Sequence, residues 1–349
     1  MIIYIIVYLI LILSCIGDFS KLNQRNFLLH CIACFMIIFI GFRRESGADS
    51  IIYIDLFKYN TDTLWNWEGK EKGYAEYGFY YLSVLLKSIF NNIDFYFTVI
   101  SCLTISFLIK SLKEFSIYPI LGFCVYYSRF LIIRDMNQIR QALAMVIIIY
   151  ALKYLLNNKK NIFIWTVILC TFIHYSSIIV LPFIFFYDKI IDNKKITLIL
   201  LSSAFIGVAG SILIKKILIA SGYGIFLSYV NTQNLGILNP VLIYQLFICA
   251  LFIYFEPILK EKQKGYNIIK NAYLYSTLLL LLTCNLGEVG GRLATIFATC
   301  EIFIIPALVN TIKPRIGGYI IYLFLIILLF AMNYYKLSTN PDSWQYIQL

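Results

Sequence analysis

The chain has 349 residues, of which 61% are hydrophobic and only 13% charged, and its mean hydropathy is +0.81. A soluble enzyme of this size is excluded, because soluble domains carry about twice that share of charged residues. The net charge of +11 does not indicate a nucleic-acid partner either, because the basic residues stand mainly in short connectors between apolar runs, as membrane topology requires. We therefore predict an all-α, polytopic membrane bundle of about 10–12 transmembrane helices.

Apolar runs that approach the roughly 20 residues needed to cross a bilayer follow one another along the whole chain. The run from Met1 to Gly17 has no basic start and no cleavage site, so we expect a retained first span that enters from outside. A shorter run at 217–230 would be a further crossing or a re-entrant piece. The predicted spans are 1–17, 27–42, 94–112, 117–133, 138–156, 162–186, 196–214, 240–259, 271–286, 293–312 and 316–335. Together, residues 1–349 form a single integral membrane domain.

The basic connectors set the orientation of these spans. Those placed inside carry Lys21 and Arg25, Lys110 and Lys113, Lys159 and Lys160, Lys260 to Lys270, and Lys313 and Arg315. Those left outside are a long external segment at about 43–93, the turn at 134–135, the loop 231–239, the turn 287–292 and the tail after 336. Within the external segment we expect 78–90 to be an interfacial or half-inserted helix. The connector Asp188–Lys195 resists this scheme, because its three lysines fall outside.

The nine cysteines lie almost wholly in apolar runs, so we expect free thiols. His30, Cys31 and Cys34 have metal-like spacing but lack a second pair of ligands, and we predict no metal site. No phosphate-binding loop, dinucleotide fingerprint or nucleophile elbow occurs in the sequence. An ATP-driven pump is therefore disfavoured, and no cofactor is expected.

The remaining chemical signals are ionisable residues at or within the spans, each of which costs about 2.5–3.5 kcal/mol at the membrane centre. The first cluster runs from Gly41 to Asp49 and is followed by Tyr53. Gly47 permits a bend that would fold Asp49 back toward Arg43. Two interpretations stay open: an anion-binding corner, or a solvated end of a span.

The second cluster, Arg134 to Gln141, lies between two apolar runs. Asp135 is a plausible N-cap for a helix from Met136 to Leu156. Arg140 would then point into the bundle beside a helix N-terminus, an arrangement that suits a phosphate or diphosphate. The alternative is a structural pair between Arg140 and a neighbouring carboxylate.

Two further signals follow along the chain. His174 shares a helical stripe with Thr171 and Ser177 near the middle of the predicted span 162–186, and it is either a general base or a packing group. Arg292 ends the glycine-rich turn that starts at Gly287. It would contact a phosphate, or pair with Glu288 or Glu301.

Taken in order, these clusters resemble the EpsG-type family of exopolysaccharide and O-antigen repeat-unit polymerases, often called Wzy polymerases. The residues that carry the resemblance are Gly41, Phe42, Arg43, Gly47, Asp49 and Tyr53; Glu76, Gly78 and Phe79; Met136 to Ala142 with Ala144; Phe172, His174 and Ser176; and Arg292. They cover most of the chain from about residue 41 to 305. Ala48 and Ala75 depart from the family pattern, where threonine and proline are expected, without removing a charged group.

The resemblance implies a GT-C-like membrane glycosyltransferase at the outer face of the bacterial cytoplasmic (inner) membrane. It would transfer a polyprenyl-diphosphate-linked glycan onto another lipid-linked repeat unit, with membrane lipids, a flippase and a chain-length regulator as further partners. Diphosphate binding falls to Arg43, Arg134, Arg140 and Arg292. The candidate bases are His174 and then Asp49 or Glu76, and the candidate substrate contacts are Asn137, Gln141 and Tyr53. The external aromatics Trp65, Trp67, Tyr74, Tyr77 and Tyr80 would stack on sugars or form an interfacial belt.

A different class of protein remains as the alternative. A flippase or transporter of lipid-linked oligosaccharides would also line its pathway with intramembrane arginines. The gathering of charged groups on one side of the membrane, and the lack of visible two-fold internal symmetry, favour the polymerase.

Overall fold

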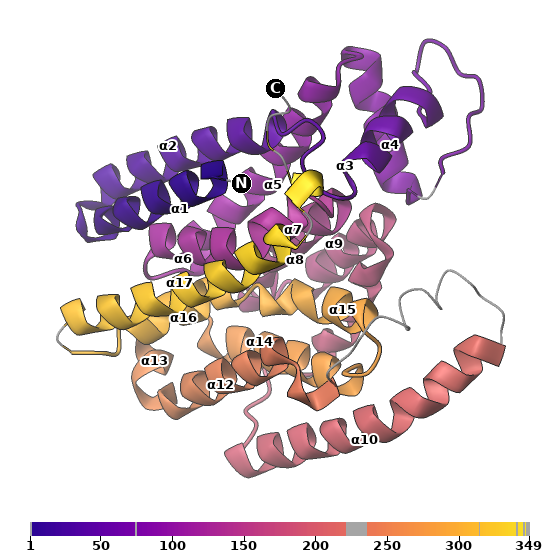
Figure 1. The fold of residues 1–349 in the computed structure, drawn as a ribbon. Coiled ribbons are helices and arrows are strands. Elements are labelled where there is room, and N and C mark those ends of the chain that lie inside the picture. Colours follow the sequence, from indigo (N-terminus) through magenta and orange to yellow (C-terminus); the bar gives the residue numbers. More distant parts are fainter. Residues whose placement is uncertain are drawn as a thin grey trace.

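The computed structural model describes residues 2–73, 75–220, 236–313, 315–339, 341–344 and 346. These residues form helices and connecting segments and contain no strand (Figure 1), which confirms the predicted all-α membrane bundle. Within the described ranges, five helices are long and apolar enough to cross a membrane, or up to seven if each of two bent helix pairs is one span. Tyr74, most of the run 217–230 and residues 231–235 of the expected outer loop lie outside the described residues.

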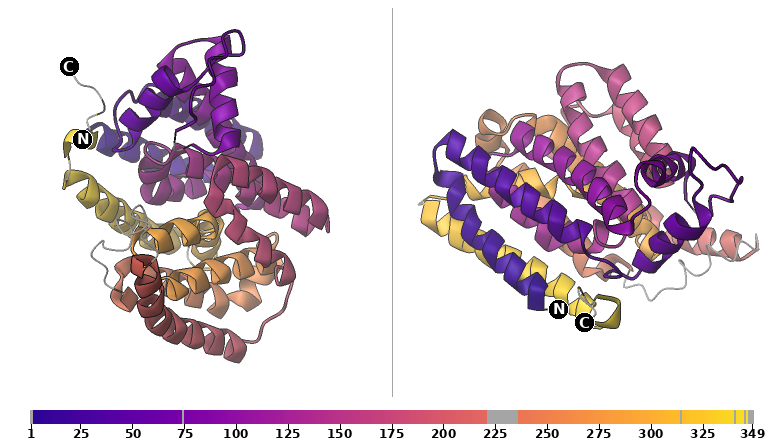
Figure 2. Two further views of the ribbon diagram at one scale, coloured as in Figure 1. Left: turned by 90° about the vertical axis from the view of Figure 1, so that its right-hand side faces the viewer. Right: turned by 90° about the horizontal axis from the view of Figure 1, so that it is seen from above.

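The helices that run between the two ends of the bundle alternate in direction (Figures 1 and 2). They are α1 (Ile2–Ser14), α2 (Leu22–Gly41), α5 (Ile93–Phe115), α6 (Pro119–Tyr126) continued by η3 (Tyr127–Leu131) and α7 (Ile132–Arg134), α8 (Ile139–Leu156), α9 (Lys160–Ile173), η4 (Tyr175–Phe185), α10 (Asn193–Ala220), α12 (Pro240–Tyr254), α14 (Tyr266–Leu282), α15 (Glu288–Ala298) with α16 (Glu301–Val309), and α17 (Arg315–Ser338). Short helices complete the fold: η1 (Cys15–Phe19), α3 (Ser50–Asp55), η2 (Leu56–Asn60), α4 (Tyr77–Ile89), η5 (Gly236–Leu238), α13 (Glu256–Lys262) and η6 (Pro341–Trp344).

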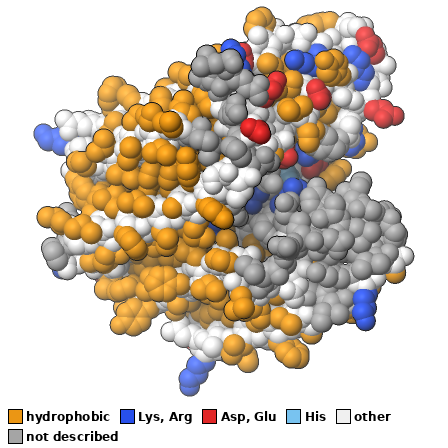
Figure 3. Space-filling model, in the orientation of Figure 1, with side chains coloured by type: hydrophobic (Ala, Val, Ile, Leu, Met, Phe, Trp, Pro, Cys, Tyr) orange, Lys and Arg blue, Asp and Glu red, His pale blue; other side chains and the backbone are white. Residues whose placement is uncertain are grey.

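The outside of the bundle is apolar, as lipid contact requires. Hydrophobic side chains gather over the left and lower parts of the face seen in Figure 3, whereas acidic and basic side chains gather over α3, α4 and the loop between them. Phe205 on α10 is 76% exposed and Phe324 on α17 is 71% exposed. Such surfaces would be unstable in water, so the exposed face is the membrane-facing one.

Side chains from distant parts of the sequence meet at the end of the bundle that carries the lysine-rich connectors, which we call the basic end. Gln263 donates to the backbone carbonyl of Phe115 over 2.7 Å, and Lys264 pairs with Glu114. The opposite end, which we call the site end, holds α3, α4 and the turn between α7 and α8. The positive-inside rule predicts that the basic end faces the cytoplasm.

The predicted single span 162–186 is wrong, because the chain turns back at His174. Helix α9 ends at Ile173 at the site end, His174 is extended (φ −152°), and η4 returns alongside α9 to the basic end. There Asn271 donates to the backbone carbonyl of Tyr187 over 3.0 Å, and the ammonium of Lys160 lies 5.1 Å from the centre of the Tyr187 ring. Two consequences follow: the connector 188–195 lies with the other lysine-rich connectors, and His174 lies at the site end rather than at mid-span.

The external segment folds as a small lobe on the site end of the bundle. Its apolar side chains form a core of their own with the first turns of α5 and α8, in which Phe57, Phe79 and Tyr96 are buried. Helix α4 matches the interfacial helix expected at 78–90. At Gly78 this helix touches α9 so closely that an added Cβ would lie 2.8 Å from the backbone oxygen of Phe172. The lobe is thereby held beside His174.

Candidate active site

The corner that follows α2 is built around Gly47 and packs on the turn that precedes α8. Gly47 has a φ of +110°, and a Cβ there would lie 2.0 Å from the carbonyl oxygen of Met136. The side-chain oxygen of Asn137 accepts the backbone N–H of Asp49 over 2.7 Å. The bend expected at Gly47 therefore exists, and it connects the first and second sequence clusters.

Arg43 lies beneath this corner and contacts Asp135 rather than Asp49. Its guanidinium donates to the backbone carbonyl of Asp135 and lies 4.1 Å from the centre of the Phe97 ring. The side chain is 1% exposed. In this arrangement Arg43 is the internal support of the turn at 135–137, so any contact it makes with a ligand is indirect.

Asp135 is not the N-cap that its position suggests. Helix α8 begins at Ile139, four residues later, and Asp135 is buried, with its carboxylate accepting the Tyr126 hydroxyl over 2.7 Å. The Tyr126 hydroxyl donates to this carboxylate and the Arg43 guanidinium donates to the backbone carbonyl of the same residue, so Asp135 is held inside the protein and does not cap the helix. Asn137 therefore lies before the helix, and its side-chain oxygen accepts the backbone N–H of Asp49 at the corner.

Glu76, Arg140 and His174 meet where the lobe joins the bundle. The carboxylate of Glu76 pairs with the Arg140 guanidinium and accepts the backbone N–H of Tyr175 over 3.1 Å. The Nδ1 atom of His174 lies 3.9 Å from the same carboxylate. Their side chains are 5%, 14% and 15% exposed, so the group is partly open at the surface. The structural pair expected as an alternative for Arg140 is thus present, with Glu76 as the partner.

The hydrogen bonds of His174 define which ring nitrogen carries the proton. Nδ1 accepts the backbone N–H of Ser176 over 3.2 Å and lies 3.1 Å from the Ser176 hydroxyl. A ring nitrogen that accepts a hydrogen bond has its lone pair engaged, so the neutral ring carries its proton on Nε2. The same contact caps the first turn of η4, which explains why α9 stops at this residue.

Arg134 and Gln141 connect the turn before α8 to α15. The Arg134 guanidinium donates to the amide oxygen of Gln141 over 2.9 Å and to the hydroxyl of Thr295 over 2.6 Å. Gln141 in turn donates to the backbone carbonyl of Arg292 over 2.6 Å. The guanidinium groups of Arg134, Arg140 and Arg292 all lie close enough to His174 to act electrostatically on its imidazole. Five of the predicted site residues, Arg134, Arg140, Gln141, His174 and Arg292, therefore lie near one another at the site end, together with Glu76.

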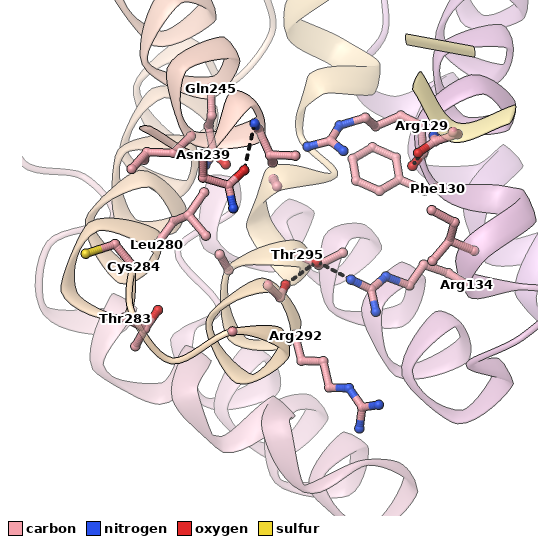
Figure 4. A pocket seen from close by; sticks show the side chains of 18 of the residues that line it. Arg129, Phe130, Arg134, Asn239, Gln245, Leu280, Thr283, Cys284, Arg292 and Thr295 are labelled. Carbon is pink, nitrogen blue, oxygen red and sulfur yellow. Dashed lines mark hydrogen bonds between the residues drawn. The ribbon is translucent and has the colours of Figure 1, made fainter. Parts of the chain in front are cut away.

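A cavity of about 440 Å³ opens beside this network, between η3, α7, α12 and α15. Arg134, Arg292 and Thr295 line one side, and Asn239 lies on the opposite wall (Figure 4). A further arginine, Arg129, also lines the cavity and is not among the predicted site residues. It stands within an apolar run, and an arginine inside such a run is itself the signal that should have singled it out.

The other predicted site residues lie around this centre. Tyr53 is buried next to Arg140, whose Nε lies 3.4 Å from the Tyr53 hydroxyl, and Gln141 is also buried. Asp49 is half-buried at the start of α3. Glu301 pairs with Arg129 and not with Arg292. Across the described ranges, no group of three or more His, Cys, Asp and Glu side chains is arranged to hold a metal ion.

The fold and the site define a class: a multi-pass helical membrane protein with arginines gathered around a cavity at one end of the bundle. The chain belongs to the EpsG family, whose model matches residues 26–349. A curated relative, the amylovoran biosynthesis protein AmsC of Erwinia amylovora, is 25% identical over an alignment covering 97% of this chain and 94% of the relative. No solved structure gives a significant match.

Proposed function

We propose that the protein is a glycosyltransferase that polymerises lipid-linked repeat units of an exopolysaccharide, O-antigen or capsule at the outer face of the bacterial cytoplasmic membrane. The observation that carries the proposal is that Arg134, Arg140 and Arg292 lie close to His174 at the site end, where Arg134 and Arg292 also line one cavity. Membership of the EpsG family and the relative named for amylovoran biosynthesis support the same conclusion.

The proposed reaction transfers a whole glycan. An acceptor hydroxyl at the end of one lipid-linked unit attacks the anomeric carbon of the other, and the bond from that carbon to the diphosphate oxygen breaks. The electron pair leaves with the polyprenyl diphosphate, whose developing negative charge is stabilised by the guanidinium groups of Arg134, Arg140 and Arg292. Because a diphosphate is already a good leaving group, these cations meet the main chemical need.

The acceptor hydroxyl must lose its proton, and two side chains at the junction of lobe and bundle are candidates to take it. Glu76 forms an ion pair with Arg140, and a carboxylate is an acceptor that can take a proton. The lone pair of His174 at Nδ1 is engaged by Ser176, so its opposite edge is a donor. We therefore assign proton removal to Glu76 and place the Nε2–H of His174 as a donor to the leaving diphosphate or to a sugar oxygen. Asp49 lies on the corner before α3 and is a weaker candidate.

The surroundings supply binding surfaces for the rest of each substrate. The exposed apolar helices can lie beside two polyprenyl tails, and the lobe presents exposed aromatic rings. Trp65 is 82% exposed, Trp67 55% and Tyr77 54%. Rings of this kind stack on the apolar faces of sugars. Four further predicted site residues stabilise the elements that carry the site: Arg43, Tyr53, Asn137 and Gln141.

The test is reconstitution of the full-length protein in proteoliposomes with purified polyprenyl-diphosphate-linked repeat units. We expect a ladder of oligomers with release of polyprenyl diphosphate, and no ladder from Arg140→Gln. Movement of the lipid-linked unit across the bilayer without new glycosidic bonds would identify a transporter instead. A chain-length regulator and a flippase, the expected partners, would change the length of the products or the supply of substrate and not the bond formed.

A further inference from the structure

Arg129 sits on a π-helical turn, and this turn aims it into the cavity. In a regular α-helix, residues five positions apart such as Arg129 and Arg134 point about 140° apart. The π-helix η3 (Tyr127–Leu131) absorbs one extra residue, which turns the following helix by about 100° and brings the two side chains to one face. Both arginines accordingly line the same cavity.

Other helices stabilise the widened turn. Asn333 on α17 donates its side-chain amide to the backbone carbonyls of Ser128 and Arg129, the latter over 3.2 Å. Asn333 is 5% exposed. A buried amide from a distant helix thus fixes the irregular turn, and irregular turns of this kind are frequent at functional sites.

The guanidinium of Arg129 is held from one side and open on the other. Its Nε lies 3.5 Å from the carboxylate of Glu301, which is fully buried and accepts the hydroxyl of Tyr273 over 3.0 Å and that of Tyr244 over 3.3 Å. The Arg129 side chain donates no hydrogen bond to any other described residue. Its Nε is buried, whereas its two terminal amino groups are not among the buried nitrogen atoms that lack a partner. Figure 4 shows them directed into the cavity.

We infer that Arg129 is an anion-binding residue on the wall of this cavity, and that its terminal amino groups take phosphate oxygens of a lipid-borne diphosphate. The inference rests on the proposed function and adds a binding group to it. Arg129 and Arg134 approach the same space from one helix, and Arg292 from another. Two phosphates present several oxygens, which matches planar guanidinium donors better than a single ammonium would.

The test measures binding rather than turnover. Full-length protein is placed in phosphatidylcholine nanodiscs, and its affinity for undecaprenyl diphosphate is measured with and without competing inorganic pyrophosphate. Arg129→Gln alone would leave Glu301 as an unpaired buried charge, so the informative variant is the double change Arg129→Gln with Glu301→Gln. Removing two charge-assisted hydrogen bonds should weaken binding about 10- to 100-fold.

Matched variants separate this role from a structural one. Glu301→Gln alone keeps the arginine charge and should bind within about threefold of the wild type. Lys270→Met with Glu256→Gln removes another ion pair, 3.0 Å long and at the basic end, and should bind as the wild type does. Equal losses in both double variants, or no loss in the Arg129 double variant, would overturn the inference.

A second measurement separates a diphosphate from a lipid headgroup as the source of the bound phosphate. It compares the retention of phosphatidylglycerol by the wild type and by the Arg129 double variant. Pyrophosphate that competes in the wild type but not in the Arg129 double variant supports a diphosphate site. An effect of Arg129 seen only as altered retention of phosphatidylglycerol would assign the residue to a lipid headgroup and reject the diphosphate site. Binding that depends on Arg129 in a protein that forms no ladder would leave this inference standing while the polymerase proposal fails. If the wild type forms a ladder but the double variant binds with unchanged affinity, the polymerase proposal stands and the inference about Arg129 fails.

Discussion

Glu76 and Arg140 form an ion pair across 64 positions of sequence, and this pair joins the external lobe to the bundle. Glu76 stands immediately before α4 and Arg140 is the second residue of α8. The backbone N–H of Tyr175, just after the turn at His174, donates to the same carboxylate. One carboxylate therefore sets the relative positions of three segments around the proposed reaction centre.

Removing Arg140 tests whether this pair is structural or also functional. Arg140→Gln leaves the Glu76 carboxylate without its partner in a largely buried place, and we expect a loss of about 3–5 kcal/mol in stability. Glu76→Gln added to it removes the uncompensated charge and should restore most of the thermal midpoint in detergent. Polymer should be absent from the single variant because the cation beside the diphosphate is missing, and from the double variant because the carboxylate assigned to take the proton is missing as well. A double variant that regains both stability and polymer would make Arg140 and Glu76 structural residues only.

The geometry at His174 predicts different outcomes for two substitutions. If the ring donates from Nε2, His174→Gln keeps an N–H donor and should retain activity within about tenfold, whereas His174→Ala should lose about 100- to 1,000-fold. The initial rate of ladder formation measures both. Equal and complete loss in the two variants would show that His174 takes a proton, since glutamine cannot act as a base.

Asp135 predicts a pH dependence of stability. It lies in the turn between α7 and α8, outside the membrane-spanning segments, and burial raises its pKa to about 7, although the Tyr126 hydroxyl and the Arg43 guanidinium act in the opposite direction. The folded state therefore holds this proton more tightly than the unfolded chain, whose aspartates have a pKa of about 3.9. The contribution to the free energy of unfolding is complete below about pH 4 and is lost as the pH rises through about 7.

The thermal midpoint of the purified protein should accordingly fall between about pH 5 and about pH 8. Asp135→Asn, which keeps the side-chain shape without the titration, should remove this part of the slope. Asp55→Asn, at an exposed position on α3, is the matched control and should keep it. An unchanged slope in Asp135→Asn would assign the dependence to other groups.

The sequence was sufficient for the class of fold and for most of the charged residues that meet at the site, because ionisable groups in apolar runs are rare and their order along the chain is a strong signal. It was not sufficient for their geometry. The break at His174 depends on a side chain that caps a 3₁₀-helix, and the burial of Asp135 depends on Tyr126 and on Arg43, 92 residues away. Arg129 gains its direction from a π-helical turn that no periodicity in the sequence indicates.

Gly47 tests the close contact between the first and second clusters. Gly47→Ala adds a Cβ that would meet the Met136 carbonyl at 2.0 Å in a backbone conformation with φ of +110°, so the corner must shift. We expect a loss of about 1–3 kcal/mol in stability and a matching loss of polymer. Gly69→Ala has the same kind of positive φ (+72°) with open space around the new atom, and it isolates the strain of the backbone from the clash. Similar behaviour of the two variants would remove the clash as the cause.

The return of the chain at His174 predicts the side of the membrane on which the connector 188–195 lies. Asn157 and Lys194 are exposed at the basic end, whereas Glu71 is exposed on the external lobe. With a membrane-impermeant maleimide, Glu71→Cys should label in intact cells, and Asn157→Cys and Lys194→Cys only after permeabilisation. The wild type supplies the background, because its exposed thiols Cys31, Cys34 and Cys102 lie within α2 and α5, in the lipid-facing part of the bundle. Labelling of Lys194→Cys from outside would make residues 160–186 a single span, return His174 to mid-membrane and separate it from Glu76 and Arg140.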